Sequence, residues 1–417
     1  MKKYRLIMAS CAALAMTSVS AAGGLNIDFN GFMQVRGFAY DNLNGNDNVN
    51  DSSRGVDQRY RLWTNAALNE HAKAVFAIEM DSTWGDNAVG KVGADETGAI
   101  EIKHLYLDLH VPGTELHATL GTQGYWLGDG FIQGDDASGM QLHYTLDSGD
   151  GLHFAWTKLA EGDPASHKQD ADYYQLQYST QAGGWNVSPF VGYLNGQPTG
   201  LGLRNEGFSN DFESWYLGVE ADGNIGDIRL QGTLIANSWD NDADITGTDV
   251  SDGNGLAVRL KGTYRSGATA YTVEGAHYGD SKIGEFTNVR GYNNFSEIIT
   301  GGRFDGRSAM GGSSAAATGT RGDYYMNYQY LKLGAEHNLN PRHKLSAYYI
   351  FAQEAQDNVF RANSSARALG HEIDVYFDCT LAEGVTLTVG GGYLIADDDF
   401  GAGDDAWKVG TAVTYRF

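Results

Sequence analysis

The sequence is poor in cysteine, proline and basic residues. It has 2 cysteines and 5 prolines in 417 residues, and 29 lysines and arginines stand against 52 aspartates and glutamates. Once the expected signal peptide is cleaved only Cys379 remains, which excludes an intrachain disulfide and a haem-attachment motif. The acidic balance argues against nonspecific binding of nucleic acid. Long apolar runs are also missing, so no segment is expected to cross a membrane as a helix.

The N-terminal residues predict an export signal. A basic start at residues 2–5 precedes a short apolar stretch at 6–16, and Val19-Ser20-Ala21 supplies the small residues that a signal peptidase requires. We expect residues 1–21 to be a cleaved signal peptide and residues 22–417 to form one domain. A lipoprotein signal at Cys11 is the less favoured alternative, because the apolar stretch continues beyond it.

Glycine and aromatic residues are abundant instead, with 56 Gly, 24 Tyr, 17 Phe and 8 Trp. From Ala406 to Phe417 every second residue could face hydrocarbon, and the residues between are small or charged. Successive side chains of a strand point to opposite faces, so this stretch has one apolar and one wet face. A final strand that ends on an aromatic residue resembles the C-terminal signature of bacterial outer-membrane barrels.

The same alternation predicts 18 strands, with 16 as an alternative. They are expected near residues 29–40, 59–68, 72–81, 100–111, 115–123, 139–146, 152–158, 172–180, 185–194, 213–221, 227–237, 256–265, 269–278, 324–337, 343–353, 371–381, 385–395 and 406–417.

The connections alternate strictly between short turns and longer loops. This asymmetry is typical of transmembrane antiparallel β-barrels, which keep short turns on the periplasmic side and long loops outside. In lipid such a sheet must close, because unpaired backbone groups at an open edge would face hydrocarbon. Pro189 fits poorly inside a strand, and we expect a bulge or a displaced boundary there.

Two sets of segments resemble known families. Residues 59–62, 79–85, 102–108 and 120–123 resemble homotrimeric outer-membrane porins of sulfate-reducing bacteria. Residues 370–375 with 387–393 are similar to the closing strands of the alginate-export barrel family. The first resemblance implies a trimer, and the second implies a monomer with a basic lumen, at odds with the acidic balance of this chain.

Charged residues on the wet faces are the candidate pore-lining residues. A lumen of 18 strands is wide enough to hold water, so charges on the inner face can select among solutes. The predicted pore-lining and selectivity set is Arg36, Arg59, Arg61, Lys73, Glu79, Asp81, Asp108, Arg229, Arg259 and Lys261.

The loop at residues 124–139 is expected to fold into the pore and narrow it. Several of its residues are too apolar for a solvent-facing tip, and the others supply negative charge. The predicted constriction residues are Trp126, Asp129, Phe131, Asp135 and Asp136. We expect these acids to face the Arg36/Arg59/Arg61 patch and set up a field across the constriction. Alternatively, Trp126 and Phe131 belong to an outer aromatic girdle.

No specific binding site is expected in the other loops. The longest, residues 279–323, is interpreted as a surface lid in preference to a pore plug. Asp240, Asp242 and Asp244 have the spacing that opens a calcium loop, but the expected glycine and glutamate are missing. His104 and His110 lie about 20 Å apart along one strand, too far to share a metal. No catalytic residues, metal site or cofactor are therefore predicted.

The function that fits best is an outer-membrane porin of a Gram-negative cell, a channel for passive diffusion of small hydrophilic solutes or ions. The expected partners are outer-membrane lipid, lipopolysaccharide and two further copies of the chain in a homotrimer. A channel specific for a sugar acid or polysaccharide is one alternative, and the barrel sheath of an electron-transfer conduit is another. An enzyme is not expected, because no convergent nucleophile and base are found.

Overall fold

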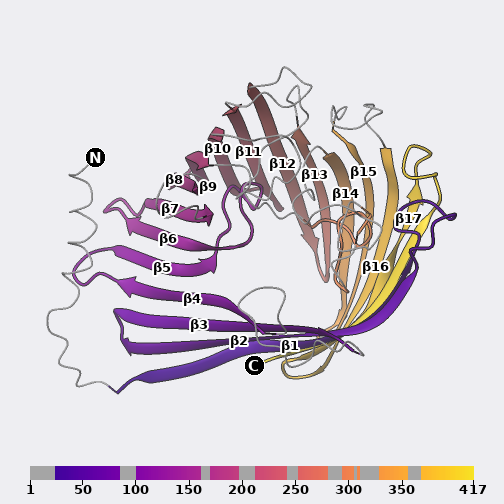
Figure 1. Ribbon diagram of the computed structural model, residues 1–417, viewed down its shortest axis with the longest axis horizontal. Coiled ribbons are helices and arrows are strands. Elements are labelled where there is room, and N and C mark those ends of the chain that lie inside the picture. Colours follow the sequence, from indigo (N-terminus) through magenta and orange to yellow (C-terminus); the bar gives the residue numbers. More distant parts are fainter. Residues whose placement is uncertain are drawn as a thin grey trace.

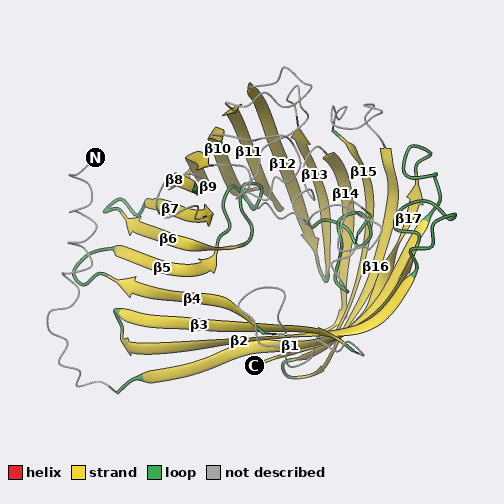
Figure 2. Cartoon of the chain, in the orientation of Figure 1, coloured by secondary structure: helices red, strands yellow, loops and turns green. Residues whose placement is uncertain are grey.

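The alternating segments of the sequence form strands throughout the computed structural model. The structure describes residues 24–84, 100–160, 170–196, 212–241, 252–279, 294–304, 308–309, 328–355 and 368–417. Among these residues every regular element is a strand (Figure 2). Within the same ranges, no helix is long and apolar enough to cross a membrane.

Eighteen strands are present, which confirms the larger of the two expected numbers. Their bounds are β1 Asn26–Asp41, β2 Ser53–Asn69, β3 Ala72–Thr83, β4 Glu101–His110, β5 Leu116–Gly124, β6 Asp136–Thr145, β7 Gly151–Ala160, β8 Ala171–Ala182, β9 Trp185–Gly196, β10 Phe212–Ile225, β11 Ile228–Asn241, β12 Asp252–Ser266, β13 Thr269–Gly279, β14 Tyr328–Asn340, β15 His343–Glu354, β16 Ala368–Ala382, β17 Val385–Ala396 and β18 Ala406–Arg416.

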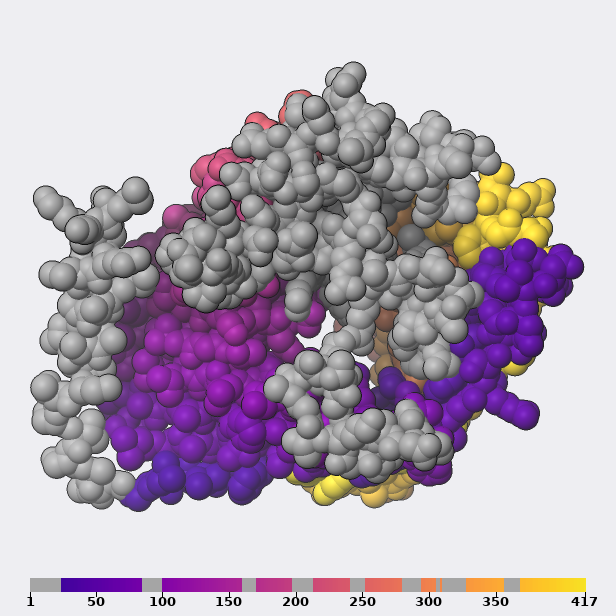
Figure 3. Space-filling view, in the orientation of Figure 1, coloured from indigo at the N-terminus to yellow at the C-terminus, as the bar shows by residue number. Residues whose placement is uncertain are grey.

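The strands form one closed antiparallel barrel (Figure 1). Each strand pairs with its sequence neighbours, and β1 pairs with both β2 and β18. The closing register runs from Phe32 opposite Arg416 to Asp41 opposite Trp407. Gly31 and Phe417 then exchange two backbone hydrogen bonds of 3.0 and 3.2 Å. The yellow C-terminal strands lie against the indigo N-terminal ones in the space-filling view (Figure 3), so the sheet has no free edge.

The two faces of the sheet differ as the alternation requires. Large apolar side chains project outward, among them Leu217, Leu260 and Leu105, which are 70%, 58% and 55% exposed. The intervening residues face the lumen and include the charged and small residues, together with buried aromatic and aliphatic side chains such as Tyr216 and Ile235. Tyrosines and tryptophans such as Tyr271 and Trp407 are also exposed on the outside. An apolar outer band with aromatic residues suits hydrocarbon between two interfaces.

Short turns and long loops alternate around the barrel as expected. Eight connections, such as that between β8 and β9, contain two to five residues, and the remaining nine are longer. The β8–β9 turn consists of Gly183 and Gly184 with φ of 59° and 84°, values that L residues rarely adopt. Both ends of the sheet, at the start of β1 and the end of β18, lie on the short-turn side.

Pro189 neither creates a bulge nor ends a strand, so that expectation is wrong. It lies within β9, and the β8–β9 register is the same on either side of it, Gln177 opposite Phe190 and Thr180 opposite Val187. Pairing lapses only beside the proline, where the hydroxyls of Ser179 and Ser188 lie 2.9 Å apart. A side-chain hydrogen bond therefore joins the two strands next to the gap that the missing backbone donor leaves.

Candidate channel lumen

The first basic patch lies on the inner face of β1 and β2, where each arginine has an acidic partner. Arg36 donates two hydrogen bonds to Asp57, of 2.8 and 2.7 Å. Arg59 pairs with Asp81 on β3 at 2.5 Å, and Arg61 pairs with Glu79. The register places these partners directly opposite one another or nearly so. The patch is therefore a row of cross-strand ion pairs.

The remaining predicted pore-lining residues also face inward and are paired. Lys73 lies 2.6 Å from Asp108 on β4. On the opposite wall, Arg229 contacts Asp222 at 2.6 Å. Arg259 and Lys261 on β12 share Glu274 on β13, at 3.0 and 3.6 Å. The inner wall thus carries alternating charges of both signs.

The segment between β5 and β6, residues 125–135, folds into the barrel. Leu127, Phe131 and Ile132 are at most 2% exposed. The Phe131 ring meets Tyr278 of β13 edge-on, with centroids 4.5 Å apart. Figure 1 shows this segment leaving β5 and reaching toward the far strands of the sheet. Apolar side chains therefore fix the segment against the β10–β13 wall, and Phe131 is not part of an outer girdle.

Asp129 makes the polar contact at the tip of this segment. It has a positive φ of 54°, flanked by Gly128 and Gly130 with φ of 58° and 78°. Its carboxylate accepts hydrogen bonds from Arg259 at 2.5 Å and Thr233 at 3.0 Å. Its backbone N–H donates to Glu220 at 3.0 Å. Three strands, β10 to β12, thereby hold one residue of the segment.

The expectation that the loop acids face the first basic patch is wrong for Asp129, which reaches Arg259 instead. Asp136, the first residue of β6, contacts Lys103 at 2.6 Å and His104 at 3.1 Å, and it also interacts electrostatically with Arg61 of the patch. The reason is that Arg36, Arg59 and Arg61 already have carboxylates on their own wall. Asp135 accepts the backbone N–H of Asp136, and Trp126 is 59% exposed.

A second segment, residues 294–304, also lies inside the barrel, which overturns the surface-lid interpretation for this part of loop 279–323. Ile298, Ile299 and Phe304 are fully buried. The Phe295 ring stacks on Tyr330 of β14 at 3.9 Å. The backbone oxygen of Phe295 accepts a 2.6 Å hydrogen bond from Lys332.

Two buried carboxylates of β16 hold this segment by its backbone. Glu372 accepts the N–H groups of Ile298 and Ile299 at 2.6 and 3.0 Å, and Asp374 accepts that of Glu297 at 3.1 Å. A carboxylate with two backbone donors makes strong charge-assisted hydrogen bonds. Three successive backbone N–H groups, those of residues 297–299, therefore anchor the segment to β16.

Glu297 of the second segment forms a buried ion pair with the inner face of β18. Its carboxylate lies 3.1 Å from Lys408 of β18, and both side chains are fully buried. Tyr376 donates a 2.9 Å hydrogen bond to the other carboxylate oxygen. Burial raises the pKa of Glu297 despite the neighbouring ammonium. Burial acts in the same direction on Tyr125 of the 125–135 segment, whose pKa it raises to about 12.

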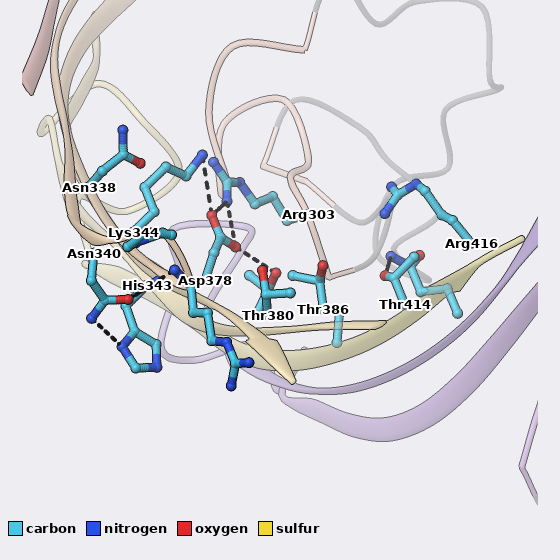
Figure 4. A pocket seen from close by; sticks show the side chains of 15 residues that line it. Arg303, Asn338, Asn340, His343, Lys344, Asp378, Thr380, Thr386, Thr414 and Arg416 are labelled. Atoms are coloured by element: carbon cyan, nitrogen blue, oxygen red, sulfur yellow. Dashed lines mark hydrogen bonds and ion pairs between the residues drawn. The ribbon is translucent and has the colours of Figure 1, made fainter. Parts of the chain in front are cut away.

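A polar cavity of about 650 Å³ opens beside the second segment (Figure 4). Asp378 lies at its centre, 3.3 Å from Arg303 and 3.4 Å from Lys344. Thr388 donates a 2.7 Å hydrogen bond to the same carboxylate. Arg416 also lines the cavity, which adjoins the β14–β15 turn at the short-turn end. The arrangement can hold small polar solutes in contact with both signs of charge.

The sequence analysis did not identify the groups that anchor the second segment. Glu372, Glu297 and Lys408 are the main ones, and their partners lie 73 or more positions away in the chain. Alternation predicts that Glu372 and Lys408 face inward, and no local signal indicates what they bind. Asp242 and Asp244 of the acidic loop lie outside the described residues.

The comparisons with known proteins show the fold of the chain and do not assign it to a family. No protein-family model matches the chain, and no curated protein sequence matches it. Among solved structures, OprD from Pseudomonas aeruginosa is 11% identical with a TM-score of 0.57, covering 95% of both chains. A BenF-like porin from Pseudomonas fluorescens Pf-5 is 12% identical with a TM-score of 0.57, covering 94% of this chain and 98% of the other. OccAB3 from Acinetobacter baumannii is 8% identical with a TM-score of 0.56, covering 94% and 100%. The chain therefore has the fold of these barrels.

Proposed function

We propose that the chain is an outer-membrane porin, a water-filled channel for passive diffusion of small hydrophilic solutes or ions. The observation that carries this proposal is the division of the closed barrel into an apolar outside and a charged inside. Two folded-in segments narrow the lumen, which is how a wide barrel gains size selection. The similar barrels include the BenF-like porin of Pseudomonas fluorescens and the outer membrane protein OprD of Pseudomonas aeruginosa.

Reconstitution in planar bilayers tests this function. The purified, refolded barrel is expected to give discrete conductance steps that grow in proportion to salt concentration. Liposomes that contain it should swell in small sugars and stay intact in large oligosaccharides. A folded barrel, verified by heat-dependent gel mobility, that gives no conductance and no swelling would contradict the proposal.

A solute-specific channel is the second candidate, and the cavity around Asp378 favours it. Arg303, Lys344 and Arg416 give this cavity a basic rim at one mouth of the barrel. Such a rim attracts anions such as sugar acids. Preference for an anionic sugar over the neutral sugar of equal size in swelling assays would support this candidate over the general pore.

Processing and assembly complete the proposal. We infer that residues 1–21 are removed on export, which N-terminal sequencing of the mature protein tests. We also infer a homotrimer in contact with lipopolysaccharide, supported by the small residues Gly31, Gly37 and Ala39, which face outward on β1. Light scattering of the native detergent complex distinguishes three chains from one.

A further inference from the structure

A row of four histidines crosses the inner wall at the short-turn end of the barrel. His110, His117, His143 and His153 lie directly opposite one another on β4, β5, β6 and β7. Their rings are stacked, with centroids 4.4, 6.0 and 4.1 Å apart along the row. Diffusion through a channel does not require such a row. Four of the 11 histidines of the chain are thus concentrated on one patch of the wall.

One end of this row also contains a carboxylate. Asp108, His110 and His117 each offer a ligand atom, and these atoms all lie within 4.8 Å of one another. Asp108 Oδ1 lies 2.6 Å from His117 Nε2. The other oxygen, Oδ2, lies 2.6 Å from the Lys73 ammonium. Lys73 therefore orients the carboxylate and leaves Oδ1 directed at the two imidazoles.

We propose that Asp108, His110 and His117 form a binding site for a divalent transition-metal ion such as Zn²⁺. Imidazole nitrogen suits zinc, copper and nickel, whereas calcium and magnesium prefer oxygen ligands. Zinc binds imidazole nitrogen and carboxylate oxygen at about 2.0–2.2 Å. Ligand atoms around a tetrahedral zinc lie about 3.4 Å apart, so His117 Nε2 and Asp108 Oδ1, now 2.6 Å apart, need to separate slightly. The third ligand atom, on the exposed His110, lies within 4.8 Å of both.

The sheet makes the site largely preformed. His110 and His117 are a directly opposed pair on adjacent antiparallel strands, so the backbone fixes the separation of their side chains. His117 Nε2 and Asp108 Oδ1 are hydrogen-bonded at 2.6 Å. When the ion binds Nε2, the proton on that nitrogen moves to Nδ1 or to solvent, so that the nitrogen lone pair and the carboxylate oxygen both face the ion.

Calorimetry on the folded, detergent-solubilised barrel tests the proposal. Titration with Zn²⁺ is expected to show one principal site per chain. Loss of a group that merely supports a ligand weakens metal binding by about 10–100-fold. We therefore expect His110→Ala and His117→Ala each to weaken binding by at least about tenfold.

The matched control is His343→Ala on β15, because His343 stacks on Phe377 and contacts Asn340, away from the row. It should leave the affinity unchanged. Asp108→Asn keeps the size of the side chain and provides a second test if a histidine variant does not fold. Visible absorption of bound Co²⁺ should show the loss independently. Equal Zn²⁺ affinity in all variants, or Ca²⁺ binding as tight as Zn²⁺, would overturn the proposal. Neither result depends on whether the barrel conducts.

Discussion

At the scale of single residues, the charges inside the barrel are set by partners that the fold brings from far away. Asp129 and Arg259 are 130 positions apart in the chain and form a 2.5 Å ion pair. Their side chains are 24% and 20% exposed, so water screens the pair only in part. Hydrogen bonds to charged groups contribute about 1.5–3 kcal/mol each. Asp129 is thus a main polar anchor of the 125–135 segment.

Replacing Asp129 by Ala is expected to loosen the segment and raise single-channel conductance. The rise should be modest, because Leu127, Phe131 and Ile132 stay buried against the wall. The variant also leaves Arg259 with one fewer carboxylate, so anion permeability should increase relative to cation permeability. Planar-bilayer recording with a salt gradient measures both quantities.

Asp150→Ala is the control for Asp129→Ala, since it removes the same charge from a short turn outside the lumen. Hydrogen bonds from Thr180, Ser148 and Tyr178 to this carboxylate lower its pKa. It should conduct like the unaltered protein. If the two variants behave alike, Asp129 does not control the constriction.

The histidine row shows what sequence reasoning can miss at this scale. The sequence analysis compared His104 with His110 along one strand, where the strand rise separates them. The relevant neighbour of His110 is His117, across the turn between β4 and β5. The two histidines are seven positions apart, on either side of a five-residue turn. Their spacing indicates a shared metal site only once the register of the hairpin is known.

At the scale of elements, strands could be predicted from sequence and the destinations of loops could not. Strand prediction works because the alternation of apolar and polar residues is local and has a period of two. The 125–135 segment was also expected to fold inward from its apolar residues. The 294–304 segment was not, since its docking depends on Glu372 and Asp374 of a distant strand.

Removing the carboxylate anchors of β16 should release the 294–304 segment. In Glu372→Gln and Asp374→Asn the backbone N–H groups of residues 297–299 lose charged acceptors, and the double variant should lose most of the docking. We expect higher conductance and faster cleavage near this segment by a protease added to the folded barrel. Cleavage sites identified by mass spectrometry locate the change.

Asp222→Asn on the other wall is the matched control for these anchor variants. It removes a carboxylate that pairs with Arg229 and touches neither luminal segment in the described residues. Unchanged protease sensitivity in the double anchor variant, with normal folding, would show that the remaining contacts, such as Glu297 with Lys408, hold the segment without these two carboxylates.

At the scale of the whole molecule, closure of the sheet and an apolar outer surface are both needed for a barrel to lie in hydrocarbon. The β1–β18 pairing removes the sheet edges, and the outward leucines and aromatic residues then form a continuous apolar surface that suits hydrocarbon. Leu260, near the middle of β12 and 58% exposed, is a direct probe of this surface. Replacing it by Arg is expected to lower the free energy of unfolding in lipid by about 2–4 kcal/mol, the cost of a basic residue near the bilayer midplane.

Thr272→Arg on the neighbouring strand β13 is the control, because it adds the same charge to the inner face, where water can solvate it. Urea titration in bilayers, followed by tryptophan fluorescence, should therefore separate the two variants clearly. Similar losses for both would mean that the outer face of this barrel does not contact lipid, and the channel proposal would fail with it.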